Sequence, residues 1–179
     1  MFAGNRLLPG MKPVAACYAA VLPEERREGV ALVDVGAHST DVVVYYGEAL
    51  QLATTLPLCA DHFTRDLAVG VCVNFEDAEC IKRQFGSAVS ANTATNSLVE
   101  LPAKENREPR EVPRRLLNEI LEARAQELFS FVGREVARVG MERALMGGLV
   151  LTGGGTNLPG LCDVAEEALR QHALAWNTQ

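Results

Sequence analysis

Three short segments of the 179-residue chain carry residue types that suit the binding of a phosphorylated ligand. The first is DVGAHSTD at residues 34–41, where Asp34 ends an apolar run and is followed by a tight turn, the hydroxyls of Ser39 and Thr40, and a second aspartate. Such a turn exposes backbone N–H groups that hold phosphate oxygens, and a strand-end carboxylate can hold a hydrated magnesium ion. The alternative is an ordinary hairpin with a polar turn, and this segment alone leaves both open.

The second segment is a run of glycines, Gly153, Gly154 and Gly155, followed by Thr156. It lies between a predicted buried strand at residues 149–152 and a predicted helix. Glycines let the backbone approach a ligand closely, and the helix N-terminus offers free N–H groups and the positive end of its dipole. The alternative is a flexible strand-to-helix connection, so this segment alone is a weak signal.

The third segment is a predicted helix that carries Glu79 and Lys82. Residues three apart share a helix face, so this pair could bond the ribose hydroxyls or the adenine edge of a nucleoside. Taken alone, the pair is better explained as a surface ion pair of little energetic value.

The hydrophobic pattern predicts the elements that position these segments. Residues 30–36, 41–46 and 49–58 are rich in β-branched and apolar residues and are expected to form three strands in a mostly antiparallel ribbon, with a turn at Gly47-Glu48. A short helix is expected at residues 14–22. Residues 23–29 are expected to form a polar turn between this helix and the first strand.

Helices dominate the rest of the chain. Asp61 is expected to cap a helix that runs to Val69, and a second helix is expected from Phe75 to Phe85 with a stop at Gly86. Four further elements are predicted: a loop-rich stretch at 87–112, a short edge strand within it at 97–101, a long helix from 113 to 140 with an apolar face, and a last helix from 159 through 169.

Composition excludes several classes of protein. The formal net charge of −6 gives no basic field for nucleic acid, and a hydrophobic content of 48% argues against disorder. The five cysteines are odd in number and form no C-x-x-C pair, so we expect reduced, buried or half-buried thiols rather than disulfides or a zinc site. The sequence predicts neither a secretory signal nor a membrane-spanning segment. Any membrane contact must therefore come through a partner or through sequence outside this chain.

The three segments, in this order, resemble the second phosphate loop, the ribose-contacting helix and the adenosine loop of the actin and heat-shock chaperone ATPase superfamily. Within it, the chain is most similar to the FtsA type of bacterial cell-division protein, from about residue 13 to about residue 169. Four stretches carry this closer resemblance: EGVALVDVG at 28–36, DHFTRDLA at 61–68, DAECIKRQFG at 77–86 and GLVLTGGG at 148–155.

The resemblance implies an α/β fold, the second lobe of an actin-like (ribonuclease H-like) ATPase, with a mixed sheet flanked by helices and a smaller helical and strand subdomain. Residues 1–60 and 147–179 would form subdomain IIA, and residues 61–146 would form subdomain IIB.

ATP and magnesium are the implied cofactors, and the resemblance also implies their binding residues. Asp34 would hold magnesium through water, and Gly36, Ser39 and Thr40 would approach the phosphates. Glu79 and Lys82 would hold the ribose. The adenosine and its α-phosphate would lie against the glycine loop, formed by Gly153, Gly154, Gly155 and Thr156.

The phosphate turn departs from the family pattern, D-x-G-G-G-T or D-x-G-A-G-T in many members. His38 stands where glycine is common, and Ser39 stands where threonine is common. A side chain at His38 would crowd the γ-phosphate, although a lone histidine is more often packed or solvated. We therefore expect nucleotide binding with at most weak ATPase activity. The other lobe and the family's membrane-binding helix are not recognised in this sequence.

The family function would be that of an adaptor. An FtsA-like protein binds ATP between its lobes, polymerises, and links the tubulin-like protein FtsZ to the inner face of the membrane at the division septum, with IIB carrying the FtsZ contact. The alternatives are a pilus-assembly scaffold of the PilM type, or another superfamily ATPase such as a chaperone or sugar kinase. An apolar face of the long helix, if exposed, would favour self-association.

Overall fold

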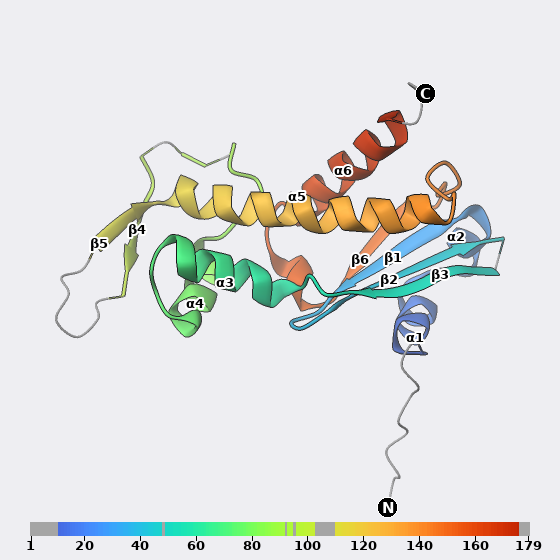
Figure 1. Cartoon of the computed structure of the whole chain (residues 1–179), viewed down its shortest axis with the longest axis horizontal. Helices are drawn as coiled ribbons and strands as arrows, with labels where there is room; N and C mark the ends of the chain where they lie inside the picture. The colour runs from blue at the N-terminus through green and yellow to red at the C-terminus, as the bar shows by residue number, and fades with distance from the viewer. Residues whose placement is uncertain (1–10, 48, 92, 95, 103–109, 176–179) are drawn as a thin grey trace, which may run out of the picture.

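The computed structural model describes residues 11–47, 49–91, 93–94, 96–102 and 110–175. Figure 1 shows an elongated molecule in which one long helix runs alongside both a sheet and a smaller helical part (Figure 1). In chain order, its elements are α1 (Met11–Ala20), α2 (Pro23–Glu28), β1 (Val30–Val35), β2 (Thr40–Tyr46), β3 (Ala49–Leu56), α3 (Ala60–Gly70), α4 (Phe75–Phe85), β4 (Leu98–Leu101), β5 (Arg110–Pro113), α5 (Arg114–Arg138), β6 (Leu149–Thr152), the 3₁₀ turn η1 (Gly154–Asn157) and α6 (Leu161–Ala175).

The main sheet is mixed and has the strand order β3-β2-β1-β6. Strands β1, β2 and β3 pair antiparallel, as their tight connections predict, whereas β6 joins β1 in parallel after a long excursion through the helices. A parallel pairing needs such a crossover because the chain must return to the same end of the sheet. The three predicted strands and the strand after the long helix are therefore confirmed, and Glu48 of the predicted second turn lies outside the described residues.

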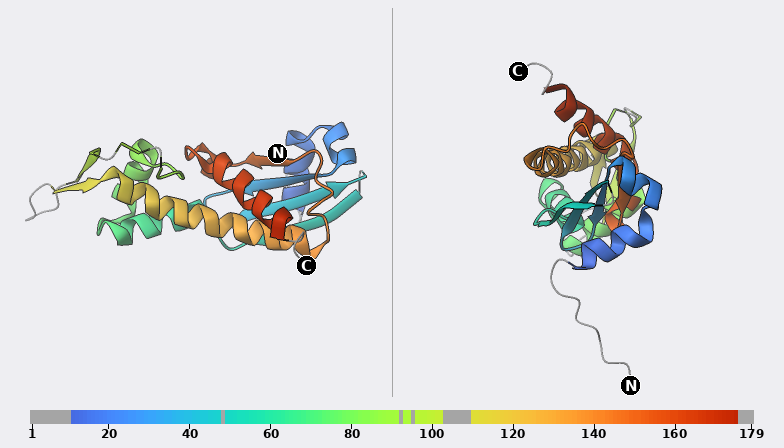
Figure 2. Two further views of the ribbon diagram at one scale, coloured as in Figure 1. Left: turned by 90° about the horizontal axis from the view of Figure 1, so that it is seen from above. Right: turned by 90° about the vertical axis from the view of Figure 1, so that its right-hand side faces the viewer.

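Alternate residues of the strands pack on opposite faces of this sheet. One face carries Val33, Val35, Val42 and Val44 and packs in the largest apolar core with residues of α5 and α6. The other face carries Leu32 and Val43 among others and packs against α1. The views agree that α5 and α1 lie on opposite sides of the strands (Figures 1 and 2). Burial on both faces explains why β1 and β2 are nearly continuous apolar runs.

Helix α5 contributes to two apolar cores. Leu117 packs in a smaller core with α3, α4, β4 and β5, and the helix from Leu121 to Val136 packs in the core of the main sheet. The apolar face of this helix is therefore covered by its own chain, and among its large apolar side chains only Leu116 is exposed. The condition under which this face would favour self-association is therefore not met, because the smaller core and the core of the main sheet together cover it.

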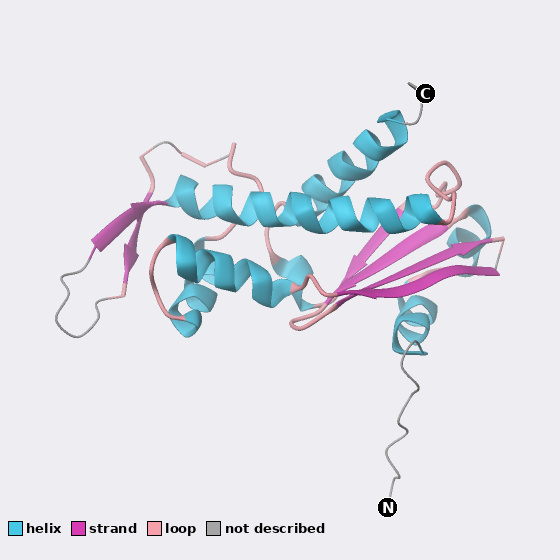
Figure 3. Ribbon diagram, viewed as in Figure 1, coloured by secondary structure: helices cyan, strands magenta, loops and turns pink. Residues whose placement is uncertain are grey.

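The smaller core contains a strand that sequence patterns do not reveal. Strand β4 pairs antiparallel with β5, with Val99 opposite Val112 and Leu101 opposite Arg110. The edge strand predicted at 97–101 is confirmed, but the loop predicted at 110–112 is wrong. Strand β5 has four residues with an exposed polar face and ends at a proline, so it lacks an apolar alternation long enough to detect. The colouring by secondary structure shows the two-stranded ribbon of β4 and β5 beyond the N-terminal end of α5 (Figure 3).

Residues 23–28 form helix α2, not the predicted polar turn. Pro23 suits the first turn of a helix, Glu25 accepts a hydrogen bond from the Leu22 N–H at 2.7 Å, and Arg26 and Arg27 lie in the last turn, where cations favour the helix dipole. Local capping therefore outweighs the polar composition that suggested a turn.

Two predicted helix starts also need correction. The N-cap of α3 is Cys59, and Asp61 lies in the first turn. A side-chain cap is unnecessary there because carbonyls of the turn after β1 accept from the first N–H groups of α3. Helix α6 begins at Leu161 rather than Pro159, because Gly160 has a φ of +79° and cannot belong to a right-handed helix.

The cysteines differ from the expectation of buried or half-buried thiols. All five are free, and Cys17 and Cys59 are buried, but Cys72, Cys80 and Cys162 are exposed. Within the part of the chain that the structure describes, no helix combines the length and apolar character needed to cross a bilayer.

Candidate functional site

A row of polar side chains crosses the main sheet near the ends of β1 and β6. In the strand register Thr55 lies beside Asp41, Asp41 beside Asp34, and Asp34 beside Thr152. The Thr55 hydroxyl donates to the Asp41 carboxylate at 2.5 Å. Burial, and then the charge of Asp41, raise the pKa of Asp34. The row thus gives two adjacent carboxylates, the hard oxygen ligands that magnesium prefers.

The turn between β1 and β2 is fastened to the start of α3. The Gly36 N–H donates to the Ser39 carbonyl at 2.9 Å, which closes the turn. The Gly36 and Ala37 carbonyls accept from the N–H groups of Ala60 and Asp61 at 2.9 and 3.0 Å. The turn predicted to bind phosphate therefore has a fixed position against the next helix.

Thr40, also predicted to approach the phosphates, is fully buried, and its hydroxyl has no hydrogen-bond partner among the residues that the structure describes. Strand alternation places it on the face of Val42, opposite to the face that carries Asp41. The structure therefore does not bring Thr40 together with the two carboxylates.

The glycine turn packs directly on the end of β1. Gly153 has a φ of +90°, and a Cβ there would lie 2.3 Å from Oδ1 of Asp34 and 2.6 Å from the Val35 carbonyl oxygen. A Cβ on Gly155 would lie 2.5 Å from a methyl of Val35, whereas a Cβ on Gly154 would meet nothing within 4 Å. Two of the glycines thus allow close packing, and the middle one faces open space.

The predicted glycine loop is a 3₁₀ turn, η1. The Thr156 hydroxyl donates to the Gly153 carbonyl at 2.6 Å, and the Asn157 side-chain amide donates to the Gly154 carbonyl at 3.2 Å. These two hydrogen bonds lie within the turn and hold its backbone in place. The segment is therefore an ordered turn and not the flexible connection given as the alternative.

Glu79 and Lys82 belong to a network that joins α3 and α4. The Lys82 ammonium lies 2.6 Å from the Glu79 carboxylate and donates to the Thr64 hydroxyl at 2.7 Å. Thr64 in turn donates to Glu79 at 2.5 Å, and Arg83 donates to the same carboxylate at 2.8 Å. The pair is therefore more than an isolated surface ion pair.

This network determines the charge state of Glu79. Burial of the carboxylate acts to raise its pKa, but hydrogen bonds from Lys82, Thr64 and Arg83, with the charge of Lys82, outweigh burial and lower the pKa to about 2. Glu79 is consequently ionised at neutral pH, and it holds two cations at the surface between α3 and α4.

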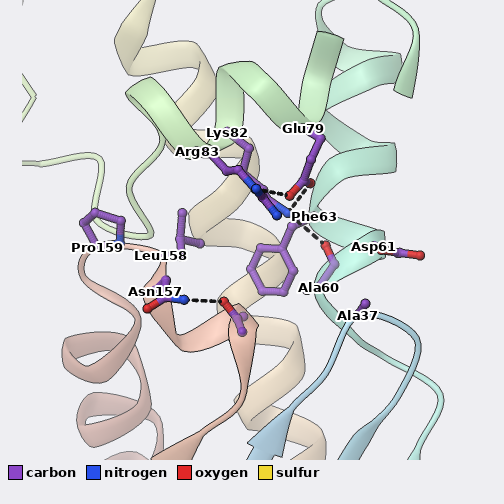
Figure 4. A pocket seen from close by; sticks show the side chains of 12 residues that line it. Ala37, Ala60, Asp61, Phe63, Glu79, Lys82, Arg83, Asn157, Leu158 and Pro159 are labelled. Atoms are coloured by element: carbon purple, nitrogen blue, oxygen red, sulfur yellow. Dashed lines mark hydrogen bonds and ion pairs between the residues drawn. The ribbon is translucent and has the colours of Figure 1, made fainter. Parts of the chain in front are cut away.

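A cavity of about 470 Å³ lies between α3 and α4 on one side and η1 on the other. Figure 4 shows Glu79, Lys82 and Arg83 on one wall and Asn157, Leu158 and Pro159 facing them (Figure 4). The lining consists of Ala37, Ala60, Asp61, Phe63, Glu79, Lys82, Arg83, Gly154, Gly155, Asn157, Leu158 and Pro159. The three segments singled out in the sequence therefore meet at one cavity, each through at least one residue.

Apart from Thr40, the predicted residues fall into two groups. Glu79, Lys82, Gly154 and Gly155 line the cavity. The second group lies next to the cavity. It contains residues of the turn that bears Ala37 and residues joined to that turn by the contact of Gly153 with Asp34, namely Asp34, Gly36, Ser39, Gly153 and Thr156.

Several residues of the site were not predicted. Arg83 follows Lys82 and lies four residues after Glu79, a spacing that itself indicates a helical ion pair. Thr64 lies on a different helix, so no sequence spacing could have identified it.

The strand order and the position of the glycine turn after β6 define the chain as one lobe of an actin-like ATPase fold. Solved structures agree. MreB5 of Spiroplasma citri bound to ADP superposes with a TM-score of 0.60 at 17% identity, over 81% of this chain and 47% of that one. A MamK double helical filament gives 0.62 at 17% identity, over 80% and 47%. The PilM–PilN pilus biogenesis complex gives 0.60 at 21% identity, over 90% and 38%. At these identities the likeness shows the fold alone.

Sequence comparison identifies the family within this fold. The family model described as "Cell division protein FtsA" matches residues 31–177. FtsA of Pseudomonas aeruginosa is 32% identical over 157 residues, which cover 88% of this chain, and FtsA of Bacillus subtilis is 30% identical over 162 residues, which cover 90%. The chain therefore belongs to the FtsA family of cell division proteins, which confirms both the predicted fold class and the resemblance.

The match covers a limited part of the relatives. The aligned region spans 38% of the Pseudomonas protein and 37% of the Bacillus protein. This chain therefore corresponds to less than two-fifths of their length.

Proposed function

We propose that this chain forms one wall of an ATP site in an FtsA-type division protein, which polymerises and links FtsZ to the membrane. The proposal is supported by the cavity at which three separated segments meet, and by membership of the FtsA family. MreB5 proteins with the same fold have been crystallised with ADP and with AMPPNP. Those ligands are compatible with a nucleotide in the cavity described above.

At the nucleoside end of the proposed site, Glu79 and Lys82 hold the ribose. Their side chains are already aligned by Thr64 and Arg83, so binding costs little loss of side-chain freedom. The backbone of Gly154 and Gly155 lies against the adenosine and its α-phosphate, because no side chain intervenes there.

At the phosphate end, Gly36 and Ser39 approach the phosphates through the turn that bears Ala37. Asp34 suits a magnesium ion held through water, since it is a half-buried carboxylate at a strand end, beside Asp41, with the Gly153 backbone packed against it. Magnesium, when bound there, would offset phosphate charge. Because the contribution of this chain is to position and neutralise, we propose nucleotide binding with at most weak ATP hydrolysis.

Substitution at Gly154 tests the nucleotide site directly. A Cβ at this position meets nothing within 4 Å, so Gly154→Asp should fold while it adds a negative charge to the cavity wall. We expect calorimetric titration with magnesium-ATP to show binding to the wild-type chain and a loss of at least about tenfold in the variant, because the new carboxylate repels the phosphates at short range.

Gly154→Ala is the matched control, since it adds a side chain without charge. Retained binding in Gly154→Ala with lost binding in Gly154→Asp supports the site. Equal binding by the wild type and Gly154→Asp would exclude the glycine turn as the nucleotide contact.

The adaptor role is proposed from family membership. In this proposal, residues 1–60 and 147–179 form subdomain IIA, residues 61–146 form subdomain IIB, and IIB contacts FtsZ. The protein would act in the cytoplasm, at the inner face of the membrane at the septum, and would reach the membrane through segments other than these. Cosedimentation with FtsZ polymers tests the contact, with Leu98→Asp as the comparison, because Leu98 is exposed on β4 of IIB and is not part of the smaller core. Equal pelleting of both chains would argue against the exposed face of β4 as the binding surface.

Self-association into filaments is the remaining part of the proposal, and filament formation by MamK, which shares the fold, is compatible with it. Because the apolar face of α5 is buried in this chain, the contacts must involve other surfaces. Light scattering over a concentration series, with and without magnesium-ATP, tests this, and a constant monomer mass throughout would contradict it.

A further inference from the structure

The rim of the cavity contains a carboxylate that the proposed nucleotide contacts do not use. Asp61 lines the cavity together with Ala37, and its N–H donates to the Ala37 carbonyl at 3.0 Å. Its side chain is 22% exposed, and its Oδ2 lies 2.9 Å from Nδ1 of the His38 imidazole. His38 itself is 87% exposed. The pair therefore sits where the turn that bears Ala37 meets the cavity.

The charge of this rim depends on a proton. The charged side chains in the cavity lining are Asp61 and Glu79 against Lys82 and Arg83, so the lining is balanced when His38 is neutral. Glu79 is bonded to both cations, which leaves His38 as the cation for Asp61. Histidine gains and loses its proton near neutral pH. A proton on His38 therefore changes the net charge at the phosphate end by one unit.

We propose that His38 and Asp61 form a proton-dependent charge pair that sets the affinity of the cavity for the polyphosphate part of a nucleotide. This inference rests on the proposed ATP site. With His38 protonated, the carboxylate of Asp61 is neutralised and the rim accepts phosphates. With His38 neutral, the bare carboxylate repels them.

Other titratable groups surround the pair and must be separated from it. Asp34 and Asp41 lie on the strands that bear the turn, in the row across the sheet. On α3, the Nδ1 of His62 lies 3.1 Å from the Cys59 thiol, and Asp66 is bonded to Arg124 of α5. On α4, Glu79 is ionised at neutral pH. The test replaces only His38 and Asp61 by asparagine, so that all of these other groups are present in every protein compared.

The test compares ligands that differ in phosphate number. Calorimetric titrations with adenosine, ADP and ATP, all without magnesium, are made at about pH 6 and about pH 8 on the wild type, His38→Asn, Asp61→Asn and the double variant. At the lower pH, we expect the ratio of ATP affinity to adenosine affinity to be about three- to tenfold greater in the wild type than in His38→Asn. The reason is that one positive charge acts on several phosphates at a distance of several Å.

The variants separate this effect from the titration of ATP itself. Terminal phosphates also gain a proton near pH 6, but that change is common to all four proteins, so only the difference between them reports His38. Asp61→Asn should bind ATP more tightly than the wild type at about pH 8 and should show no further effect of His38→Asn.

Each outcome decides a different question. If the ratio of ATP affinity to adenosine affinity is the same in the wild type and in His38→Asn at both pH values, the inference is overturned. The proposed ATP site would still stand. Equal losses for adenosine and ATP in His38→Asn would also overturn it, because they would indicate that the pair only holds the turn in place. Failure of the wild type to bind any of the three ligands would overturn the proposed site together with this inference.

Discussion

At the phosphate end of the proposed site the close contacts are made by backbone atoms, whereas at the nucleoside end they are made by charged side chains of α4 and the Thr64 hydroxyl of α3. The backbone of Gly153 packs on the end of β1, and the carbonyls of Gly36 and Ala37 accept from the start of α3. By contrast, Glu79 is held by three side chains, two from its own helix and Thr64 from α3. One end is therefore fixed by the fold, and the other by electrostatics.

This difference predicts different sensitivities for the two ends. A backbone contact has no room for an added atom, so a single methyl group should disturb it regardless of pH or salt. A charged network tolerates changes of shape but depends on ionisation. Substitutions at the two ends should thus be distinguishable by their size and by their dependence on pH.

The largest effect is expected at Gly153. Gly153→Ala would place a Cβ 2.3 Å from Oδ1 of Asp34 and would strain a backbone with φ of +90°. We expect the free energy of unfolding to fall by about 2–4 kcal/mol, with little dependence on pH. Urea denaturation followed by circular dichroism measures this loss.

Gly154→Ala provides the comparison one residue along, because its Cβ meets nothing within 4 Å. It should change the stability by less than about 0.5 kcal/mol. Similar losses in the two variants would mean that the turn responds to glycine content in general and that the contact with β1 is not decisive.

An intermediate effect is expected at Lys82, whose side chain is 12% exposed. Lys82→Met keeps the length of the side chain but leaves the partly buried Glu79 with one cation fewer. We expect a loss of about 1–3 kcal/mol, and a pKa of Glu79 that rises from about 2 towards its ordinary value, because the stabilising charge and hydrogen bond are gone.

NMR titration of the Glu79 carboxyl and urea denaturation check the two parts of this prediction. Arg83→Met is the control, since Arg83 bonds the same carboxylate but is 78% exposed. Its effect on stability should stay below about 1 kcal/mol. A pKa of Glu79 that is unchanged in Lys82→Met would show that Lys82 does not control the network.

The same difference explains what the sequence could predict. The turns after β1 and β6 lie where the sequence predicts them, because the apolar runs of the two strands identify the strand ends, and the parallel pairing of β1 with β6 then brings Asp34 and Gly153 together. Sequence patterns placed Glu79 and Lys82 on one helix face, but they could not indicate Thr64, which reaches them only through the packing of α3 on α4.

Strand β5 and helix α2 were missed for a related reason. The first is recognisable only through its pairing with β4, and the second depends on hydrogen bonds and charge positions at the ends of a six-residue helix. Local composition favoured a loop in the first case and a turn in the second. Neither the long-range pairing nor the end contacts can be read from hydrophobic periodicity.

The smallest effect is expected from protonation of Glu79. Its pKa is about 2 in the folded chain against an ordinary 4.5, so its stabilising contribution is fully present above the ordinary value. That contribution is lost as the pH falls through the lower value. After allowance for its partial exposure, it should amount to about 1–2 kcal/mol. Glu79→Gln lacks it at every pH, because an amide carries no charge.

The measurement is the difference in unfolding free energy between the wild type and Glu79→Gln from about pH 6 to about pH 2. Ionic stabilisation predicts that this difference shrinks as the pH falls, since protonated Glu79 resembles glutamine. Glu119→Gln, which removes an exposed ion pair with Arg115 on α5, should show little difference at any pH. A constant difference for Glu79→Gln would mean that the carboxylate acts through shape and hydrogen bonds alone, and both ends of the site would then be fixed by packing.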